Sequence, residues 1–298
     1  MATESLHSRW EFREEDEIVP GLTALTLLGG GLRYEAYLAW HERMRALVVA
    51  KVVRPDLVED RATLGGLRRE IELLERLDHP IIVRSFGGEV DGPRPHVVLE
   101  HLEGPRLSSL KRRDGPLLLE QLVALAIEIA AALHYLAAEG LVHLDVKPSN
   151  IIMGGPPRLI DLSVARTVEQ CPTLRSPVGT DAYMAPEQAT VPSEDLGPPA
   201  DVWGLGATLH EGVTGKRPFR RGVRDSTEPE ERFPQLTEEP AELPAHVPTA
   251  LAESIMACLA RDPAARPTPG DLGDRLQVVL QGLPKPKLSR LHPRPRWR

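Results

Sequence analysis

The stretch His143–Asn150 reads HLDVKPSN and places an acid, a cation and an amide within one turn. In phosphoryl transfer, an aspartate such as Asp145 can accept the proton of an attacking hydroxyl, a lysine such as Lys147 can hold the moving phosphate, and an asparagine such as Asn150 can bind a metal. Short apolar runs flank the stretch and predict buried strands on either side of an exposed polar loop. The alternative is an ordinary proline-containing turn.

Further motifs at suitable distances argue against an ordinary turn. They are VAK at Val49–Lys51, Glu70 in a helical stretch, DLS at Asp161–Ser163, APE at Ala185–Glu187 and DVWGLG at Asp201–Gly206. Together with HLDVKPSN, this ordered set resembles the signature of the eukaryotic-type serine/threonine protein kinases, including those of bacterial type.

The resemblance implies an α+β, bilobal protein-kinase fold over residues 22–282. The small lobe, residues 22–103, is expected to hold a five-stranded antiparallel sheet with one main helix. The large lobe, residues 104–282, is expected to be mainly helical. A charged arm at residues 1–21 and a basic, proline-rich tail at residues 283–298 are expected to flank this domain.

Hydrophobic periodicity gives a matching division into strands and helices. The expected strands are Leu22–Leu28, Tyr34–Trp40, Leu47–Val53, Ile81–Phe86 and His96–Glu100. The expected helices are Arg61–Leu77, Leu117–Ala138, Pro199–Thr214, Pro248–Ala260 and Thr268–Leu280. Residues 217–246 are dense in Pro, Glu and Arg and predict no long helix.

Composition narrows the setting of the protein. The chain has 298 residues, two cysteines and a formal net charge of −7. So few cysteines suit a reducing cytoplasm, and the negative charge argues against nucleic acid as the main partner. The polar N-terminus does not resemble a signal peptide, and no apolar run is expected to span a membrane. The basic tail is a candidate contact for an acidic partner or surface.

The segment LLGGGLRYEAYLA lies where kinases carry the glycine-rich loop that covers nucleotide phosphates. Taken alone, glycines between two strands more often mark a hairpin turn. Placed before VAK, they imply a cover for ATP that consists of Leu28, Gly29, Gly30, Gly31 and Ala36. Tyr34 stands where the family has its third glycine, so its side chain is expected to lie over the phosphates or to swing to solvent.

Lys51 is flanked by apolar residues, so we expect it to have a buried partner rather than to reach solvent as an ordinary strand lysine. The resemblance implies that it contacts the α and β phosphates of ATP and pairs with Glu70, which shares a helical stripe with Leu67 and Leu74. Glu72 is expected to face solvent. The other residues assigned to the nucleotide pocket are Ala50, the gatekeeper Leu99, and the backbone of Glu100 and Leu102.

The resemblance assigns the chemistry to the catalytic loop. Asp145 would orient and deprotonate the acceptor hydroxyl, and Lys147 would steady the γ phosphate. Asn150 and Asp161 would hold Mg²⁺, which accepts hard oxygen ligands and keeps several waters. Lys147 and Thr180 follow the pattern of serine/threonine kinases, and Thr180 is expected to bond both Asp145 and Lys147. Two structural contacts are also implied: Glu187 with Arg266, and Asp201 with the catalytic-loop backbone.

Two departures from the family pattern concern regulation. Leu144 stands where most kinases have arginine, and DLS replaces DFG, so that Leu162 takes the place of the aromatic residue and Ser163 that of glycine. A phosphorylated residue of the activation segment normally binds that arginine. Because leucine cannot make this pair, phosphorylation of the activation segment is expected to have little effect on kinase activity. The candidate hydroxyls are Thr167, Thr173 and Ser176.

These residues predict an ATP-dependent and Mg²⁺-dependent serine/threonine kinase that acts on hydroxyls of proteins. A pseudokinase, which binds nucleotide as a scaffold without turnover, is the first alternative; the altered glycine-rich loop and DLS favour it, whereas the complete set of catalytic residues opposes it. A small-molecule kinase is the second alternative, and such enzymes normally lack a segment like Gly179–Glu187.

Overall fold

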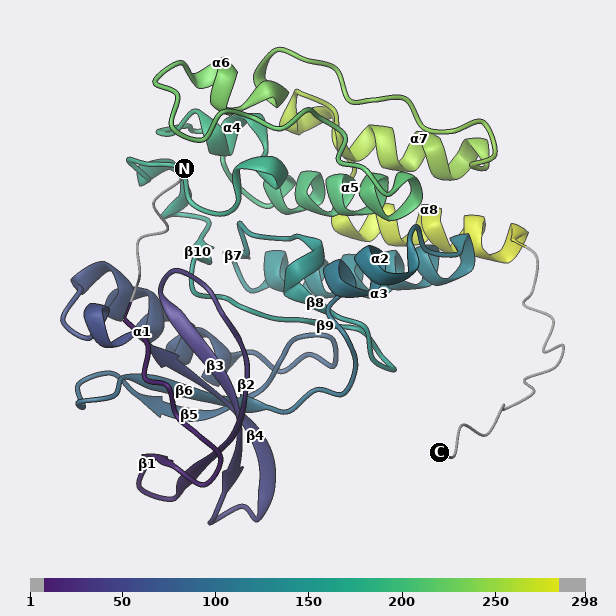
Figure 1. Cartoon of the computed structure of the whole chain (residues 1–298). Coiled ribbons are helices and arrows are strands. Elements are labelled where there is room, and N and C mark those ends of the chain that lie inside the picture. The colour runs from purple at the N-terminus through teal and green to yellow at the C-terminus, as the bar shows by residue number, and fades with distance from the viewer. Residues whose placement is uncertain (1–7, 284–298) are drawn as a thin grey trace, which may run out of the picture.

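The computed structural model describes residues 8–283 and divides them into a sheet-rich small lobe and a larger helical lobe (Figure 1). The bilobal α+β fold expected from the sequence is confirmed. Residues 1–7 of the expected arm and residues 284–298 of the expected basic tail lie outside the described part of the chain.

The small lobe is built on one antiparallel sheet. In β3, every second residue from Glu35 to Ala39 is buried, which is the pattern of a strand whose two faces meet different surroundings. The strand order is β1-β2-β3-β4-β6-β5, and each strand runs antiparallel to its neighbours. The bounds are β1 (Glu17–Val19), β2 (Leu22–Gly30), β3 (Tyr34–His41), β4 (Ala46–Val53), β5 (Ser85–Glu89) and β6 (His96–Glu100).

The sheet has six strands where five were expected, because the N-terminal segment supplies β1. Ile18 of β1 is fully buried, and Trp10 and Phe12 pack against the same apolar cluster. The acidic residues between them face solvent. Residues 8–19 are therefore part of the small lobe rather than of a free charged arm, since their few apolar side chains all pack against the sheet.

Helix α1 (Arg61–Arg76) begins at Asp60, whose carboxylate accepts a hydrogen bond from the backbone N–H of Thr63 (2.8 Å). Its buried stripe includes Leu67, Glu70 and Leu74, so the predicted amphipathic helix is confirmed. The strand expected at Ile81–Phe86 begins only at Ser85, because the backbone of Ile81 and Val83 bonds Leu159 of the large lobe instead.

The large lobe consists mainly of helices. Their bounds are α2 (Leu107–Asp114), α3 (Leu119–Ala138), α4 (Pro186–Ala189), α5 (Pro199–Thr214), α6 (Pro229–Arg232), α7 (Thr249–Cys258) and α8 (Pro269–Gly282). Helix α5 matches its predicted bounds and ends at Gly215, whose φ of 73° suits a glycine cap. The polar helix α2 was not predicted. Residues 217–246 hold only the short α6 and one 3₁₀ turn, as expected.

Helix α3 runs through the middle of the large lobe and packs against α5 and α8 (Figure 1). Contrary to the expectation that no run reaches membrane-spanning length, α3 is long and apolar enough to span a bilayer by length and composition. Half of its apolar window is buried within the described residues. Its apolar character is therefore accounted for by the core that it forms.

Two short antiparallel pairs carry the segments on which the site is built. Strand β7 (Leu141–Val142) pairs with β10 (Arg166–Thr167), and β8 (Ile151–Ile152) pairs with β9 (Arg158–Leu159). The loop between β7 and β8 is the HLDVKPSN stretch. The pairs fix both ends of this loop, as the flanking apolar runs predict.

Candidate active site

Side chains from other parts of the large lobe hold the backbone of the HLDVKPSN loop in place. Asp201 of α5 accepts hydrogen bonds from the N–H groups of His143 (2.6 Å) and Leu144 (2.7 Å), so the expected contact is present. Leu144 has a φ of 64°, a conformation uncommon for leucine. The side chain of Gln188 donates to the Leu144 carbonyl (2.7 Å). These bonds hold the strained turn and fix the backbone that carries Asp145.

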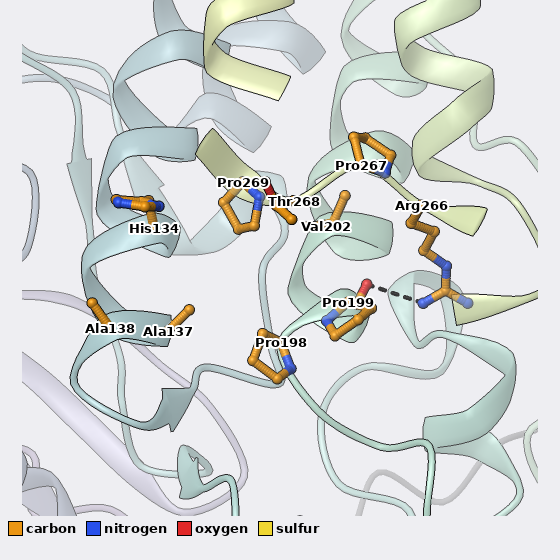
Figure 2. Close-up of a pocket in the computed structure, with 10 residues that line it drawn as sticks. All are labelled: His134, Ala137, Ala138, Pro198, Pro199, Val202, Arg266, Pro267, Thr268 and Pro269. Atoms are coloured by element: carbon orange, nitrogen blue, oxygen red, sulfur yellow. Dashed lines mark hydrogen bonds between the residues drawn. The ribbon is translucent and has the colours of Figure 1, made fainter. Parts of the chain in front are cut away.

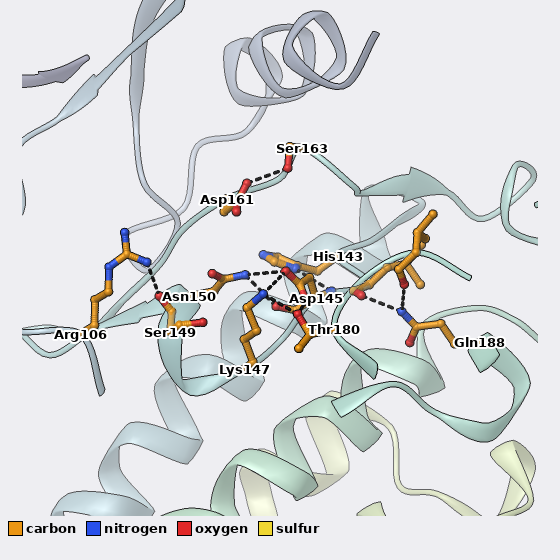
Figure 3. A network of polar contacts seen from close by, with 12 residues as sticks. Arg106, His143, Asp145, Lys147, Ser149, Asn150, Asp161, Ser163, Thr180 and Gln188 are labelled. Atoms are coloured by element: carbon orange, nitrogen blue, oxygen red, sulfur yellow. Dashed lines mark hydrogen bonds and ion pairs between the residues drawn. The ribbon is translucent and has the colours of Figure 1, made fainter. Parts of the chain in front are cut away.

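Three polar side chains converge on Asp145 (Figure 3). Its Oδ1 accepts from the Thr180 hydroxyl (2.8 Å), and its Oδ2 accepts from Lys147 Nζ (2.6 Å) and Asn150 Nδ2 (3.0 Å). Lys147 also donates to Thr180 Oγ1 (2.6 Å). The expected contacts of Thr180 are therefore present. The loop and the activation segment together place a carboxylate, an ammonium and a hydroxyl within hydrogen-bonding reach.

A second polar group centres on Lys51 of β4. Its ammonium donates to Glu70 Oε2 (2.6 Å) and Asp161 Oδ1 (2.7 Å), whereas Glu72 is exposed, as predicted. Burial lowers the pKa of Lys51, but the carboxylates of Asp161 and Glu70 outweigh burial and hold the pKa above its usual range. Lys51 therefore stays cationic and joins β4, α1 and the DLS turn.

Asp161 has the properties of a metal ligand. Partial burial alone raises its pKa, but the Lys51 ammonium and the Ser163 hydroxyl hold the pKa well below its usual range, so the carboxylate stays ionised. Both of these hydrogen bonds are accepted by Oδ1. Asn150 uses its Nδ2 to bond the carbonyl (2.9 Å) and carboxylate (3.0 Å) of Asp145, which directs its amide oxygen away from Asp145. The donor set thus fits Mg²⁺, which binds oxygen.

The other residues predicted to surround a nucleotide lie on strands β2, β3, β4 and β6 of the small lobe or directly after β2 and β6. Ala36 of β3 pairs in register with Lys51, and Ala50 and Leu99 are buried. Leu28 is exposed near the end of β2, next to Gly29, Gly30 and Gly31. Leu102 is half-buried in the segment that joins the lobes. Glu100 already uses its N–H on Arg84 (3.0 Å) and its carboxylate on Arg84 and Arg158.

Tyr34 does not swing to solvent, which was one of its two expected positions, and it points toward α1 and Lys51. Its hydroxyl donates to the carbonyl of Thr63 in the first turn of α1 (3.0 Å), and the Lys51 ammonium lies 4.5 Å from its ring centroid. Burial raises the pKa of Tyr34 to about 12, so the hydroxyl remains a donor. A Cβ on Gly66 would lie only 3.2 Å from that hydroxyl. Tyr34 points inward because the glycine in α1 leaves room for it.

Leu144 lies in an apolar cluster, buried to 3% exposure. Cys171 is buried in the same cluster, and Val168, Leu174 and Val178 of the activation segment pack against it. The segment is therefore attached at the position of the missing arginine by apolar contact. Farther along, Glu187 and Arg266 form the expected bidentate ion pair (2.6 and 2.8 Å).

Two residues that hold the site were not singled out from the sequence. Arg106 donates to the Ser149 carbonyl (2.8 Å), and Gln188 donates to the Leu144 carbonyl (Figure 3). Ser163, noted in the sequence for replacing a glycine, donates to Asp161 (2.8 Å). Gln188 follows the APE motif directly, and a polar residue at a buried helix start is a signal that could have identified it. Nothing local marks Arg106, because its partner is 43 residues away.

A cavity of about 420 Å³ lies in the large lobe, apart from these residues, between α3, the start of α5 and the start of α8 (Figure 2). Its lining is mostly proline and alanine. Arg266 at its edge uses all its N–H groups on Glu187 and on the carbonyls of Pro199, Ala260 and Arg261. The cavity thus has no free guanidinium donor, and none of the predicted site residues lines it.

Comparison with known proteins agrees with the geometry. A family model described as the protein kinase domain matches residues 22–276. The chain is 35% identical over 243 residues to "Serine/threonine-protein kinase PkaA" of Streptomyces coelicolor, covering 79% of this chain and 44% of that protein. It is 33% identical over 202 residues to "Serine/threonine-protein kinase PknB" of Mycobacterium leprae, covering 65% of this chain and 32% of that one. The chain thus spans less than half the length of these relatives.

Proposed function

This chain belongs to the protein kinase family, and from that premise we propose that it is a serine/threonine protein kinase, which transfers the γ phosphate of ATP to Ser or Thr hydroxyls of proteins. The observation that carries the proposal is the pairing of two complete polar groups. Lys51, Glu70 and Asp161 form one, and Asp145 with Lys147 is the centre of the other. Each has a separate task in the reaction.

In the proposed reaction, Asp145 accepts the proton of the acceptor hydroxyl while the hydroxyl oxygen forms a bond to the γ phosphorus. The bond between that phosphorus and the β–γ bridging oxygen breaks, and ADP leaves. Lys147 donates to the γ phosphate oxygens, which supports the developing charge. Thr180 keeps Asp145 and Lys147 in register through its two hydrogen bonds.

On the nucleotide side, Lys51 would contact the α and β phosphates, with Leu28, Gly29, Gly30, Gly31 and Ala36 above them. Ala50, Leu99 and the backbone of Glu100 and Leu102 would surround the adenine. Asp161 and Asn150 would hold Mg²⁺, which neutralises phosphate charge when bound. Glu70 orients Lys51 through the 2.6 Å bond. A reducing, cytoplasmic setting is supported by two free and buried cysteines, Cys171 and Cys258.

The pseudokinase alternative has one specific observation in its favour. Two of the three N–H donors of Lys51 are used on Glu70 and Asp161, and the Tyr34 ring lies over the ammonium. A phosphate must therefore compete with existing partners. We favour the active enzyme because Asp145, Lys147 and Asn150 are all present, and both Lys147 and Asn150 donate to the Asp145 carboxylate.

The test is incubation of the full chain with γ-labelled ATP, Mg²⁺ and a generic protein acceptor, followed by analysis of the modified amino acids. We expect label on serine or threonine, its loss when EDTA removes Mg²⁺, and its loss in Asp145→Asn. Nucleotide binding without label transfer in the parent would favour the pseudokinase. Label on tyrosine alone would contradict the Ser/Thr assignment.

A further inference from the structure

Residues 8–19, here named the N-terminal strap, lie outside the matched family domain, which begins at residue 22. They nevertheless cover one face of the small-lobe sheet. Trp10 and Phe12 stack with ring centroids 5.7 Å apart, and Phe12 meets Tyr37 of β3 edge-on at 5.3 Å. Arg94 lies over both strap rings and donates to the carbonyls of Glu17 and Ile18. The strap is thus held by aromatic, cationic and backbone contacts.

The strap also enters a buried polar network. The Trp10 N–H donates to Glu35 Oε2 (3.1 Å), and its indole Nε1–H donates to the Val53 carbonyl (2.8 Å). Glu35 is 1% exposed and also accepts from the Tyr37 hydroxyl (3.0 Å). Arg54, 6% exposed, faces Glu35 Oε1 (3.4 Å) and donates to the Ser8 carbonyl (3.2 Å). Removing one partner from a buried charge pair leaves the other charge uncompensated, which is strongly destabilising.

The same arginine holds the glycine-rich loop. Arg54 Nε donates to the Gly31 carbonyl (2.8 Å), and its backbone N–H donates to the Arg33 carbonyl (3.0 Å). Arg54 lies three residues after Lys51 at the end of β4, so one side chain connects the strap, the loop and the strand of the nucleotide lysine. A planar guanidinium presents five N–H donors in fixed directions, and in Arg54 these donors serve Ser8, Gly31 and Glu35 at once.

We propose that the N-terminal strap, acting through Arg54, positions the glycine-rich loop over the nucleotide and so sets the affinity for ATP. The proposal rests on the proposed function for its ligand. Trp10 and Arg54 are positioning residues, since they touch the loop and its supports and not the reacting atoms. Loosening the strap frees the Gly31 carbonyl and raises the mobility of the loop, while the catalytic loop in the large lobe is untouched.

The first test uses the full chain with Trp10→Ala, and Trp40→Ala as its matched control, because Trp40 is a half-exposed tryptophan at the far end of β3. We expect Trp10→Ala to weaken ATP binding about three- to tenfold, the size of one lost hydrogen bond, here that of the indole Nε1–H to the Val53 carbonyl. The KM for the protein acceptor should stay constant. Equal ATP affinities in Trp10→Ala and Trp40→Ala would overturn the proposal.

The second test measures amide hydrogen exchange of residues 26–34 without any nucleotide, so it does not depend on turnover. Arg54→Lys keeps a charge opposite Glu35 but loses the Nε–H that holds Gly31, and it serves if Trp10→Ala fails to fold. We expect faster exchange in this segment and unchanged exchange in 141–152. Unchanged exchange in 26–34 would overturn the proposal, whereas an inactive parent with faster exchange in the variant would overturn only the proposed function.

Discussion

The two lobes each carry a departure from the kinase pattern, and they accommodate it in opposite ways. In the small lobe, Tyr34 replaces a glycine and makes polar and cation–π contacts with Thr63 and Lys51. In the large lobe, Leu144 replaces an arginine and lies in an apolar cluster with Cys171. The first change adds contacts on the nucleotide side. The second change replaces a residue that could bind a phosphate by one that makes hydrophobic contacts without any phosphate. The two lobes should therefore respond differently to mutation.

Asp145→Asn is expected to have the largest effect and to separate the role of the large lobe in phosphate transfer from that of the small lobe in ATP binding. We expect label transfer to fall by about three orders of magnitude, the size expected for a lost general base with its electrostatic effect. Binding of ATP should change little, because Asp145 contacts large-lobe residues only. Steady-state kinetics and nucleotide titration of the same preparations separate the two effects. Unchanged autophosphorylation in Asp145→Asn would contradict the proposal that the protein is an active kinase.

Lys51→Met is the small-lobe counterpart. We expect a fall in turnover of about two orders of magnitude, together with weaker ATP binding, because the cation for the phosphates is lost. Glu70 and Asp161 also lose their common partner, so the melting temperature should drop. Lys216→Met, which removes a lysine of the α5–α6 connection, is a suitable control. If Lys51→Met bound ATP as tightly as the parent, the nucleotide side would be misassigned.

Leu144→Ala tests the apolar attachment in the large lobe. Deleting a buried leucine side chain costs about 2–5 kcal/mol of unfolding free energy, and the activation segment should lose order first. Leu118→Ala, at a side chain 66% exposed, should cost less than about 0.5 kcal/mol. Urea titration measures both. Equal stability of the two variants would show that Leu144 does not anchor the segment.

Tyr34 tests the polar attachment in the small lobe. Tyr34→Phe removes only the bond to Thr63, worth about 0.5–1.5 kcal/mol, and Tyr34→Gly also removes the ring from Lys51. The KM for ATP should therefore change by a few-fold in the glycine variant and less in the phenylalanine variant. An unaltered KM in Tyr34→Gly would contradict the contact described here.

The smallest effect is expected for the triple change Thr167→Ala, Thr173→Ala, Ser176→Ala. The segment packs through Val168, Leu174 and Val178 onto the Leu144 cluster, so its order does not need a phosphate. At least most of kcat on an exogenous acceptor should remain. Phosphatase treatment of the parent is the matched comparison. A tenfold loss in both would mean that phosphate contributes about 1.4 kcal/mol to the active state.

The sequence predicts best where a local pattern and a boundary residue agree. The bounds of helix α5 follow from a proline at its start and Gly215 at its end. The residue types in the polar stretch of the catalytic loop indicate the chemistry expected of that loop. The N-terminal strap was missed because exposed acids outnumber its apolar residues, although the alternation of Trp10, Glu11 and Phe12 has the period of a strand.

The direction of the Tyr34 side chain could not follow from its sequence position. The ring points inward because Gly66 has no side chain, and these two residues lie on different elements. The apolar surroundings of Leu144 likewise depend on residues from the activation segment and α5. Contacts between distant parts of the chain decide both cases, and no local pattern encodes them.

The buried thiol of Cys171 allows opening of the activation segment to be followed by alkylation. Burial raises the pKa of Cys171, and that of Cys258 in α7, to about 12, so neither thiolate is available to an electrophile in the closed protein. Labelling of Cys171 then requires release of the segment, whereas Cys258 lies in the main core and requires wider unfolding. The alkylation rate of Cys171 in the folded protein, divided by its rate in the unfolded chain, would give the opening equilibrium of the segment, and the rate at Cys258 would report wider unfolding.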